Sequence, residues 1–183
     1  MKVSITGHTS GIGKSLYETL DNTIGFSRSN GYDIKNDDVI NKIYELSKDC
    51  DIFINNAYFK DSQLKLYNKF YENWRYKEKT IINIISKTVY SKLNDEYTKY
   101  KKELSEKTIQ NTDMGGYKKC RVVNVNPGYV KTKMTEKFHS KERMLDVEEL
   151  TDIIKWIIKL PQHIQVGEIG IWITDTRRET TLL

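Results

Sequence analysis

The chain has 183 residues, of which 38% are hydrophobic and 30% are charged, a composition typical of one globular domain with a sizeable core. It contains no run of 18 apolar residues, which excludes an apolar transmembrane helix. The net charge of +5 comes from 30 basic and 25 acidic residues that are interspersed, whereas nucleic-acid-binding proteins more often carry a stripe or tail of one sign. We therefore expect a single domain over residues 1–183 that binds a small anionic molecule and neither nucleic acid nor a membrane.

The cysteines and the first residues indicate the compartment. Cys50 and Cys120 have no metal-ligand spacing and suggest no disulfide framework. The chain passes from Met1 directly into a predicted strand, without the apolar stretch of a signal peptide. We therefore expect a reduced, cytoplasmic protein without a metal site.

The first predicted element is a short buried strand at residues 2–6, followed by an apolar helix face that begins at residue 12. Between them lie Gly7, Gly11 and Gly13, spaced Gly-x-x-x-Gly-x-Gly. Glycine lets backbone N–H groups approach a ligand closely, and the start of a helix favours an anion. The sequence therefore predicts either a phosphate-binding loop or an ordinary glycine-rich turn between a strand and a helix.

The second predicted strand covers residues 23–28 and ends in Ser27 and Arg28. In dinucleotide-binding folds this strand end faces the adenosine ribose, and an acidic residue there favours NAD. Serine and arginine suit a 2′-phosphate instead. If Arg28 is not simply a solvated loop residue, the pair favours NADP(H) over NAD(H).

The rest of the chain alternates between amphipathic and buried segments. The pattern predicts helices at 36–46, 63–74, 96–110 and 147–160, and strands at 51–57, 80–86, 121–126 and 167–174. This alternation predicts a Rossmann-type α/β fold, with a doubly wound, mostly parallel sheet in a three-layer α/β/α arrangement. Ligands bind such sheets beyond the carboxyl ends of the strands. The residues at those predicted ends are Gly7, Arg28, Asn55, Ser86 and Pro127.

Two further segments are interpreted from their composition. The polar segment 135–146 has no clear period, as expected for a mobile loop over a ligand site. In the helix at 63–74, Leu64, Tyr67, Tyr71 and Trp74 lie on or near one face. Such an aromatic stripe is more typical of a core or a subunit interface than of a ligand site.

Tyr97 and Lys101 are four residues apart and therefore share a face of their predicted helix. A lysine ammonium beside a phenol lowers the pKa of the tyrosine from about 10, so that the tyrosine can act as a general acid or base on a carbonyl or alcohol. The Ser86 hydroxyl, at a neighbouring strand end, could hold the same oxygen. With 12 tyrosines and many lysines in the chain, the pair alone leaves a plain surface feature open.

Taken in order, the motifs resemble the short-chain dehydrogenase/reductase family over nearly the whole chain. They are Thr6-Gly7-x-x-x-Gly11-Ile12-Gly13, Asn55-Asn56-Ala57, Ser86, Tyr97-x-x-x-Lys101 and Asn126-Pro127-Gly128-Tyr129-Val130-x-Thr132. The resemblance implies an NADP(H)-dependent oxidoreductase that interconverts a small carbonyl compound and its alcohol by hydride transfer. It also implies a homodimer or homotetramer, with the helices at 63–74 and 97–110 as dimer faces.

The resemblance implies a role for each matching residue. Tyr97 would donate the proton, Lys101 would lower the pKa of Tyr97 and bind the ribose, and Ser86 would orient the carbonyl. The glycine loop would hold the pyrophosphate, Arg28 the 2′-phosphate and Asp33 the adenine. The implied cofactor-binding set is Gly7, Ser10, Gly11, Ile12, Gly13, Ser27, Arg28, Asp33, Asn55, Ala57, Tyr97, Lys101, Pro127, Val130 and Thr132.

The chain departs from the family pattern in three places. The helix expected between Arg28 and Asp33 is missing, and Asn-Asn-Ala-Gly reads Asn-Asn-Ala-Tyr58, which puts a bulky side chain near the cofactor. The active-site asparagine has only Gln63 or Asn68 as candidates. These departures keep open a dinucleotide-binding regulatory or interaction module with little or no turnover. A basic nucleic-acid-binding α/β protein is the third interpretation.

Overall fold

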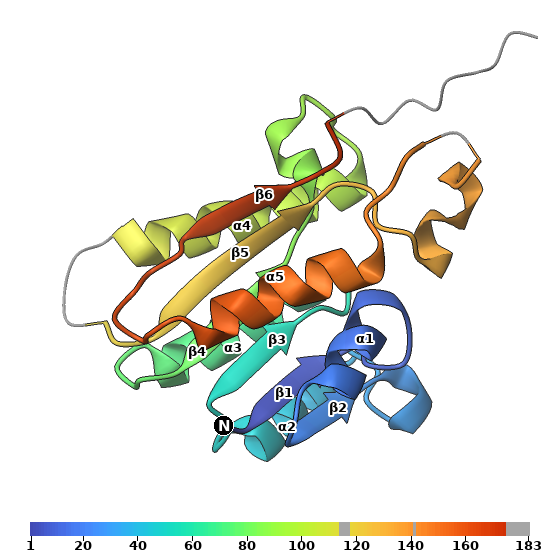
Figure 1. Ribbon diagram of the computed structural model, residues 1–183. Helices are drawn as coiled ribbons and strands as arrows, with labels where there is room; N and C mark the ends of the chain where they lie inside the picture. The colour runs from blue at the N-terminus through green and yellow to red at the C-terminus, as the bar shows by residue number, and fades with distance from the viewer. Residues whose placement is uncertain (114–117, 141, 175–183) are drawn as a thin grey trace, which may run out of the picture.

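The computed structural model describes residues 1–113, 118–140 and 142–174 and contains a six-stranded sheet (Figure 1). All neighbouring strands pair in parallel, in the order β2-β1-β3-β4-β5-β6. The strands are β1 (Val3–Thr6), β2 (Thr23–Phe26), β3 (Ile52–Asn55), β4 (Thr80–Ile84), β5 (Arg121–Pro127) and β6 (Glu168–Ile171). The six strands predicted from the sequence are confirmed, with bounds that differ by a few residues.

Helices cover both faces of the sheet, which confirms the three-layer α/β/α arrangement (Figure 1). One layer contains α1 and α5, and the other contains α2, α3 and α4. The α-helices are α1 (Gly11–Thr19), α2 (Asp37–Ser47), α3 (Ser62–Trp74), α4 (Glu96–Asp113) and α5 (Val147–Lys159). Three 3-10 helices, η1 (Arg28–Asn30), η2 (Lys87–Tyr90) and η3 (Lys133–Phe138), lie between them.

Strand β3 shows why the sheet is apolar on both sides. Successive side chains of a strand point to opposite faces. Ile52 and Ile54 pack in the cluster beneath α1 and α5, whereas Phe53 packs in the cluster beneath α2, α3 and α4. An uninterrupted apolar run is therefore what a parallel strand covered by two helix layers requires.

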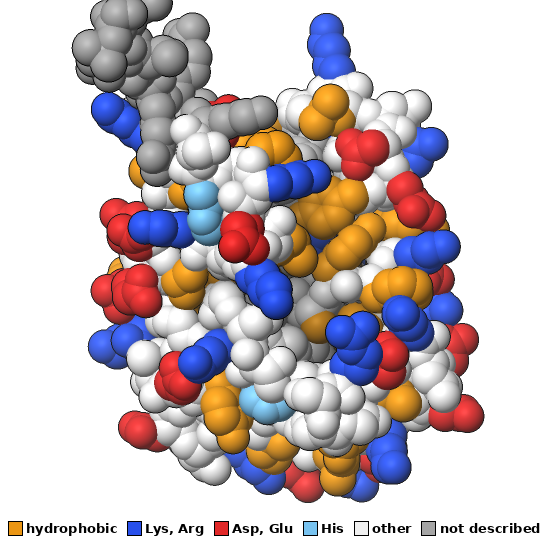
Figure 2. Space-filling model, turned by 90° about the vertical axis from the view of Figure 1, so that its right-hand side faces the viewer, with side chains coloured by type: hydrophobic (Ala, Val, Ile, Leu, Met, Phe, Trp, Pro, Cys, Tyr) orange, Lys and Arg blue, Asp and Glu red, His pale blue; other side chains and the backbone are white. Residues whose placement is uncertain are grey.

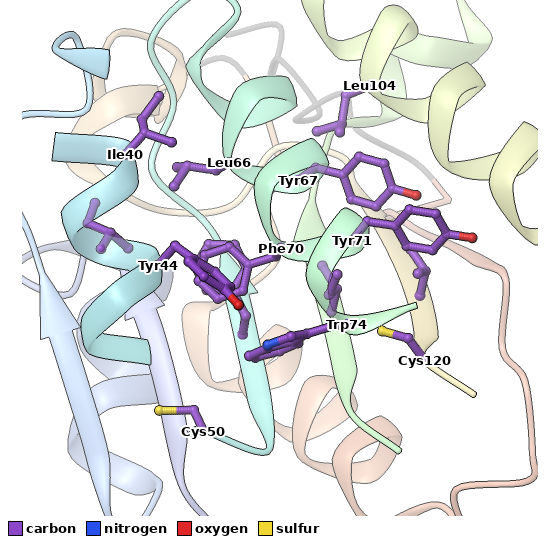
Figure 3. Close-up of a cluster of buried hydrophobic side chains, with 14 of the residues drawn as sticks. Ile40, Tyr44, Cys50, Leu66, Tyr67, Phe70, Tyr71, Trp74, Leu104 and Cys120 are labelled. Atoms are coloured by element: carbon purple, nitrogen blue, oxygen red, sulfur yellow. The ribbon is translucent and has the colours of Figure 1, made fainter. Parts of the chain in front are cut away.

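The aromatic stripe of α3 belongs to the core (Figure 3). Tyr67, Phe70, Tyr71 and Trp74 are all buried, and the Phe70 ring stacks on Phe53 with centroids 3.7 Å apart. A buried aromatic side chain contributes more to stability than a smaller apolar one because it removes more area from water. Of the two interpretations of this stripe, the core is the one that the structure shows.

A column of asparagines lies in register across three strands, on the sheet face covered by α3 and α4. Asn55 Nδ2 donates to Asn83 Oδ1 at 3.0 Å, and Asn83 Nδ2 donates to Asn124 Oδ1 at 3.3 Å. Asn124 Nδ2 in turn donates to the Thr108 hydroxyl of α4. Because buried polar groups are costly unless they are paired, this column fixes the register of β3, β4 and β5.

The segment at 135–146 differs from the expected irregular loop. Its first residues continue η3, which starts from a capping box in which Thr132 N donates to Thr135 Oγ1 at 3.1 Å. The segment is joined to the connection after β5 by an isolated bridge between Val130 and Leu145. The threonine pair supplies the local hydrogen bonds that the periodicity of the sequence does not reveal.

No helix in the described part of the chain combines the length and apolar character that crossing a membrane requires. Cys50 and Cys120 are buried free thiols. Within the described ranges, no group of three or more His, Cys, Asp and Glu side chains is placed to hold a metal ion.

Candidate active site

The glycine loop connects β1 to α1. Strand β1 is the place where the strand order reverses, because β2 lies on one side of it and β3 on the other. Gly7 has φ +76° and Gly11 has φ +51°, conformations that favour glycine. The Asn56 carboxamide donates to Thr6 O at 3.0 Å, and a Cβ on Gly7 would lie only 2.8 Å from its nitrogen. A Cβ on Gly13 would collide with the Gly7 carbonyl oxygen. The glycines therefore let α1, β1 and β3 meet closely at the switch point of the sheet.

Ser10 and Ile12 complete this loop. Ser10 is the exposed N-cap residue of α1, and its side chain makes no capping hydrogen bond. Ile12 packs partly against the core beneath α1 and α5. Backbone N–H groups at the start of a helix have no partner within the helix, so this loop can bind a phosphate.

The connection after β2 holds Arg28 at the surface. Ser27 N donates to Asn30 Oδ1 at 2.8 Å, and Asn30 Nδ2 donates back to Gly25 O at 3.0 Å. Arg28 is exposed and forms no ion pair with any residue in the described part of the chain. Asp33 is half-buried and accepts a hydrogen bond from Lys35 N. The guanidinium of Arg28 is therefore available to an anionic ligand.

The segment after β5 packs against the glycine loop from the other side. A Cβ on Gly11 would lie 3.0 Å from the Thr132 methyl carbon. Val130 is buried, and its carbonyl oxygen accepts from Thr135 Oγ1. Pro127 is the last residue of β5 and pairs in register with Ile171 of β6. The structure therefore brings Thr132 to the glycine loop.

The hydrogen bonds of Asn55 and Ala57 mainly join neighbouring strands of the sheet. The Asn55 side chain is buried and donates to Gln63 O at 2.8 Å, in addition to its bond with Asn83. Ala57 N donates to Thr6 Oγ1 at 3.0 Å. These bonds hold the end of β3 against the end of β1.

The edge of the sheet at which the strands end is shown in Figure 2. Hydrophobic side chains are exposed near the centre of this face, and Lys and Arg side chains lie around them together with some Asp and Glu side chains. Such a surface offers apolar contact beside cationic groups, which suits a ligand that has rings and phosphates.

Tyr97 and Ser86 lie together on this edge. Ser86 follows β4, and its hydroxyl accepts from Thr88 N at 3.2 Å, which starts η2. Burial raises the pKa of the Tyr97 phenol, and interaction with the Ser86 side chain acts in the opposite direction. The two hydroxyl groups are thus close enough to influence each other.

Lys101 is almost completely buried, with 3% of its surface exposed. Its amine donates to Gln63 Oε1 at 2.6 Å and to Ile84 O at 2.9 Å. Burial lowers the pKa of this amine from 10.5 to about 7, because desolvation disfavours its charged form. The amine lies 5.4 Å from the centroid of the Tyr97 ring.

This arrangement changes one expectation about the pair. The ammonium was expected to lower the pKa of Tyr97, but that pKa is raised in this structure, and Lys101 is not among its causes. The amine hydrogens are directed at Gln63 and Ile84, and desolvation disfavours the positive charge itself.

Gln63 is the carboxamide that contacts the lysine. Besides accepting from Lys101, it donates from Nε2 to Asn55 O at 2.8 Å and to Ile84 O at 3.2 Å. Of the two candidates named from the sequence, Gln63 makes this contact, whereas Asn68 is half-buried further along α3. Gln63 therefore ties the lysine to the ends of β3 and β4.

Tyr58 packs directly on the tyrosine–lysine pair. Its ring meets Tyr97 edge to face with centroids 4.8 Å apart, and the Lys101 amine lies 5.1 Å from the Tyr58 centroid. Burial raises the pKa of Tyr58 to about 12, and neighbouring Tyr97 adds to the shift. The sequence indicated a bulky group near the cofactor, but only the fold shows that it contacts both residues.

A cavity of about 390 Å³ lies apart from these side chains, beside the segment after β5. Ser86, Tyr97 and Lys101 do not line it. Its lining residues are Lys131, His139, Glu142, Arg143, Met144, Asp146 and Ile173.

Comparisons with known proteins agree with the fold. No protein-family model matches the sequence, and no curated protein matches it at a significant level. Among solved structures, the chain is similar to a serine dehydrogenase in a closed form with NADP⁺, with 16% identity and a TM-score of 0.77 over 94% of this chain and 95% of the other. A short-chain dehydrogenase from Burkholderia cenocepacia with NADP has 16% identity and a TM-score of 0.74 over 93% and 90%.

A third similar structure is a 3-ketoacyl-(acyl-carrier-protein) reductase from Brucella melitensis with NADH, with 17% identity and a TM-score of 0.70 over 93% and 96% of the two chains. The resemblance inferred from the motifs is thus confirmed at the level of the fold.

The burial of Lys101 predicts a pH dependence of stability. The pKa of its amine is about 7 in the fold and 10.5 in the unfolded chain, so the unfolded chain binds more protons between these values. The contribution of Lys101 to the free energy of unfolding should therefore rise with pH, by about 1.4 kcal/mol per pH unit.

Urea unfolding of the wild type and of Lys101→Met measures this contribution. The difference in the free energy of unfolding between the two proteins is determined at pH 7 and at pH 9, and the two differences are compared. Lys107→Met, on an exposed position of the same helix, is the matched control. A wild-type advantage that stays constant between the two pH values would show that the Lys101 amine keeps its charge.

Proposed function

We propose that this chain is an NADP(H)-dependent oxidoreductase that interconverts a small carbonyl compound and its alcohol. One observation carries the proposal: three features lie at the same edge of a doubly wound sheet. They are a glycine loop that can bind a phosphate, the exposed Arg28, and the pair of Tyr97 and Ser86. Solved structures with the same fold include NADP- and NADH-bound dehydrogenases and reductases, which supports a nicotinamide dinucleotide as ligand.

The two halves of the edge fit a dinucleotide differently. The glycine loop offers backbone N–H groups where side chains would obstruct a pyrophosphate, and Arg28 offers an exposed guanidinium for a 2′-phosphate. Ser27 and Asp33 flank Arg28 and would border the adenosine. The nicotinamide would lie toward Tyr97, Lys101 and Thr132, where Tyr58 now covers the pair.

When bound, the reduced nicotinamide would supply the hydride. Tyr97 would donate its phenolic proton to the carbonyl oxygen while the carbonyl carbon accepts the hydride, so that the product is an alcohol and the tyrosine is left as a phenolate. Ser86 would hold the same oxygen by a hydrogen bond. Lys101, whose amine lies 5.4 Å from the centroid of the Tyr97 ring, would stabilise the phenolate when the amine is protonated.

A second candidate is a dinucleotide-binding module with little or no turnover. The contact of Tyr58 with Tyr97 and Lys101 favours it, because the catalytic residues are then covered. The same contact leaves the glycine loop and Arg28 accessible to the other half of the ligand. Binding of NADPH without turnover of any carbonyl compound would support this candidate over the enzyme.

The role of Tyr97 is tested by Tyr97→Phe, which removes one oxygen atom. General acid–base catalysis contributes roughly 10²- to 10⁴-fold, so turnover of a carbonyl panel with NADPH should fall by at least about 100-fold. The affinity for NADPH should change little. Tyr76→Phe, at an exposed tyrosine before β4, is the control. Full activity in Tyr97→Phe would refute the assignment.

The preference for NADP(H) is tested by Arg28→Ala. A hydrogen bond to a charged group contributes about 1.5–3 kcal/mol, so the affinity for NADPH should fall roughly 10- to 100-fold while that for NADH is unchanged. Calorimetric titration with both nucleotides measures the ratio. Arg75→Ala, an exposed arginine next to α3, is the control. Equal losses for the two nucleotides would place the 2′-phosphate elsewhere.

A further inference from the structure

We propose that Tyr58 controls access to the catalytic half of the site, so that its ring must move away from Lys101 and Tyr97 before the nicotinamide half of a dinucleotide can bind there. This inference rests on the proposed function, since it concerns the same site. Two contacts, with the Tyr97 ring and with the Lys101 amine, converge on the Tyr58 side chain.

The first observation is that the Lys101 amine is almost completely buried among four neighbours. Gln63 and the Ile84 carbonyl accept its hydrogen bonds at 2.6 and 2.9 Å, and the rings of Tyr58 and Tyr97 lie 5.1 and 5.4 Å away. Only 3% of Lys101 is exposed. Because three of these four neighbours are built into the sheet or into helices α3 and α4, a ligand can reach the amine only by displacing Tyr58.

The second observation concerns what Tyr58 is attached to. It lies in the connection between β3 and α3, outside both elements, and is half-buried. Gln63 and Ile84, in contrast, belong to α3 and β4. The side chain that covers the amine is therefore carried by the least constrained of the segments around it.

The third observation is backbone strain in the same connection. Lys60 has φ +44°, a left-handed conformation that is unfavourable for a residue with a Cβ. An exposed ion pair to Glu96 at 3.7 Å and a hydrogen bond from Ser62 N to Phe59 O at 2.9 Å accompany it. Strain of this kind narrows the free-energy difference between the observed conformation and an alternative one.

The two neighbouring aromatic residues of this connection have different surroundings. The Lys35 amine lies 4.8 Å from the centroid of the Phe59 ring, and Phe59 packs against the core beneath α2 and α3. Tyr58 instead contacts Tyr97 and Lys101. Movement of Tyr58 therefore leaves the residues that would bind the adenosine half in place.

Binding in two stages follows, because Tyr58 covers the residues for the nicotinamide half and not those for the adenosine half. A ligand that has only the 2′-phosphate, adenosine and 5′-phosphate would bind without moving Tyr58. A whole dinucleotide must in addition break the edge-to-face contact with Tyr97 and the contact with the Lys101 amine. The nicotinamide half then adds less affinity than it would in an open site.

The test compares adenosine 2′,5′-bisphosphate with NADPH by calorimetric titration of the wild type, Tyr58→Ala and Tyr58→Phe. Tyr58→Ala should bind NADPH about tenfold more tightly than the wild type and bind the bisphosphate equally well. Tyr58→Phe keeps the ring and should behave as the wild type. Tyr76→Ala, which removes an exposed tyrosine far along the chain, is the control. An unchanged or weaker NADPH affinity in Tyr58→Ala, or an equal gain for both ligands, would overturn the proposal.

A second readout needs no cofactor. Reaction of Lys101 with an amine-specific acylating reagent at pH 8, followed by peptide mass spectrometry, should be slow in the wild type and in Tyr58→Phe and at least several-fold faster in Tyr58→Ala. Equal rates in all three proteins would show that the Tyr58 ring does not shield the Lys101 amine. If the rates differ as expected but neither nucleotide binds any variant, Tyr58 does shield the amine and the proposed function is wrong.

Discussion

The burial of one lysine amine without a carboxylate partner is the constraint around which the candidate site is built. Lys101 is held by Gln63 and by the backbone of β4, and these bonds exist only because α3 and α4 pack side by side on the same face of the sheet. An uncompensated buried charge is expensive, so the amine gives up part of its proton affinity. The same burial that places the amine beside the tyrosine rings also weakens the charge that catalysis would use.

The sheet beneath the site is held by polar contacts of an unusual kind. Asn55, Asn83 and Asn124 form a buried column, and Gln63 joins the end of this column to Lys101. At the other side of β3, Asn56 fills the space that Gly7 and Gly13 leave free. The end of β1 is thus held by the Asn56 side-chain amide after β3, and the ends of β3 and β4 by the Gln63 side-chain amide of α3. A small change in any of these amides would shift the positions of the residues at the edge.

Much of this arrangement could be read from the sequence, because it follows from local patterns. The periodicity of apolar residues gives the six strands and five α-helices, and the glycine spacing gives the loop after β1. The contact of Tyr58 with Tyr97 and Lys101 could not be read, since it joins residues about 40 positions apart through the packing of α4 on the β3–α3 connection. The raised pKa of Tyr97 escaped for the same reason, because its main cause is the burial of the phenol in the packed fold. Asn83 and Asn124 had a usable signal, because each is a polar residue at the fourth position of a largely apolar buried strand.

The most direct test of the account is a crystal structure of the chain with NADP⁺. The account predicts the pyrophosphate at the glycine loop between Gly7 and Gly13, the 2′-phosphate at Arg28, and the nicotinamide beside Tyr97 with the Tyr58 ring displaced from Lys101. A dinucleotide bound away from the carboxyl ends of β1 and β3 would contradict the proposed function. An ordered nicotinamide beside Tyr97 with Tyr58 still packed on Lys101 would contradict the role given to Tyr58.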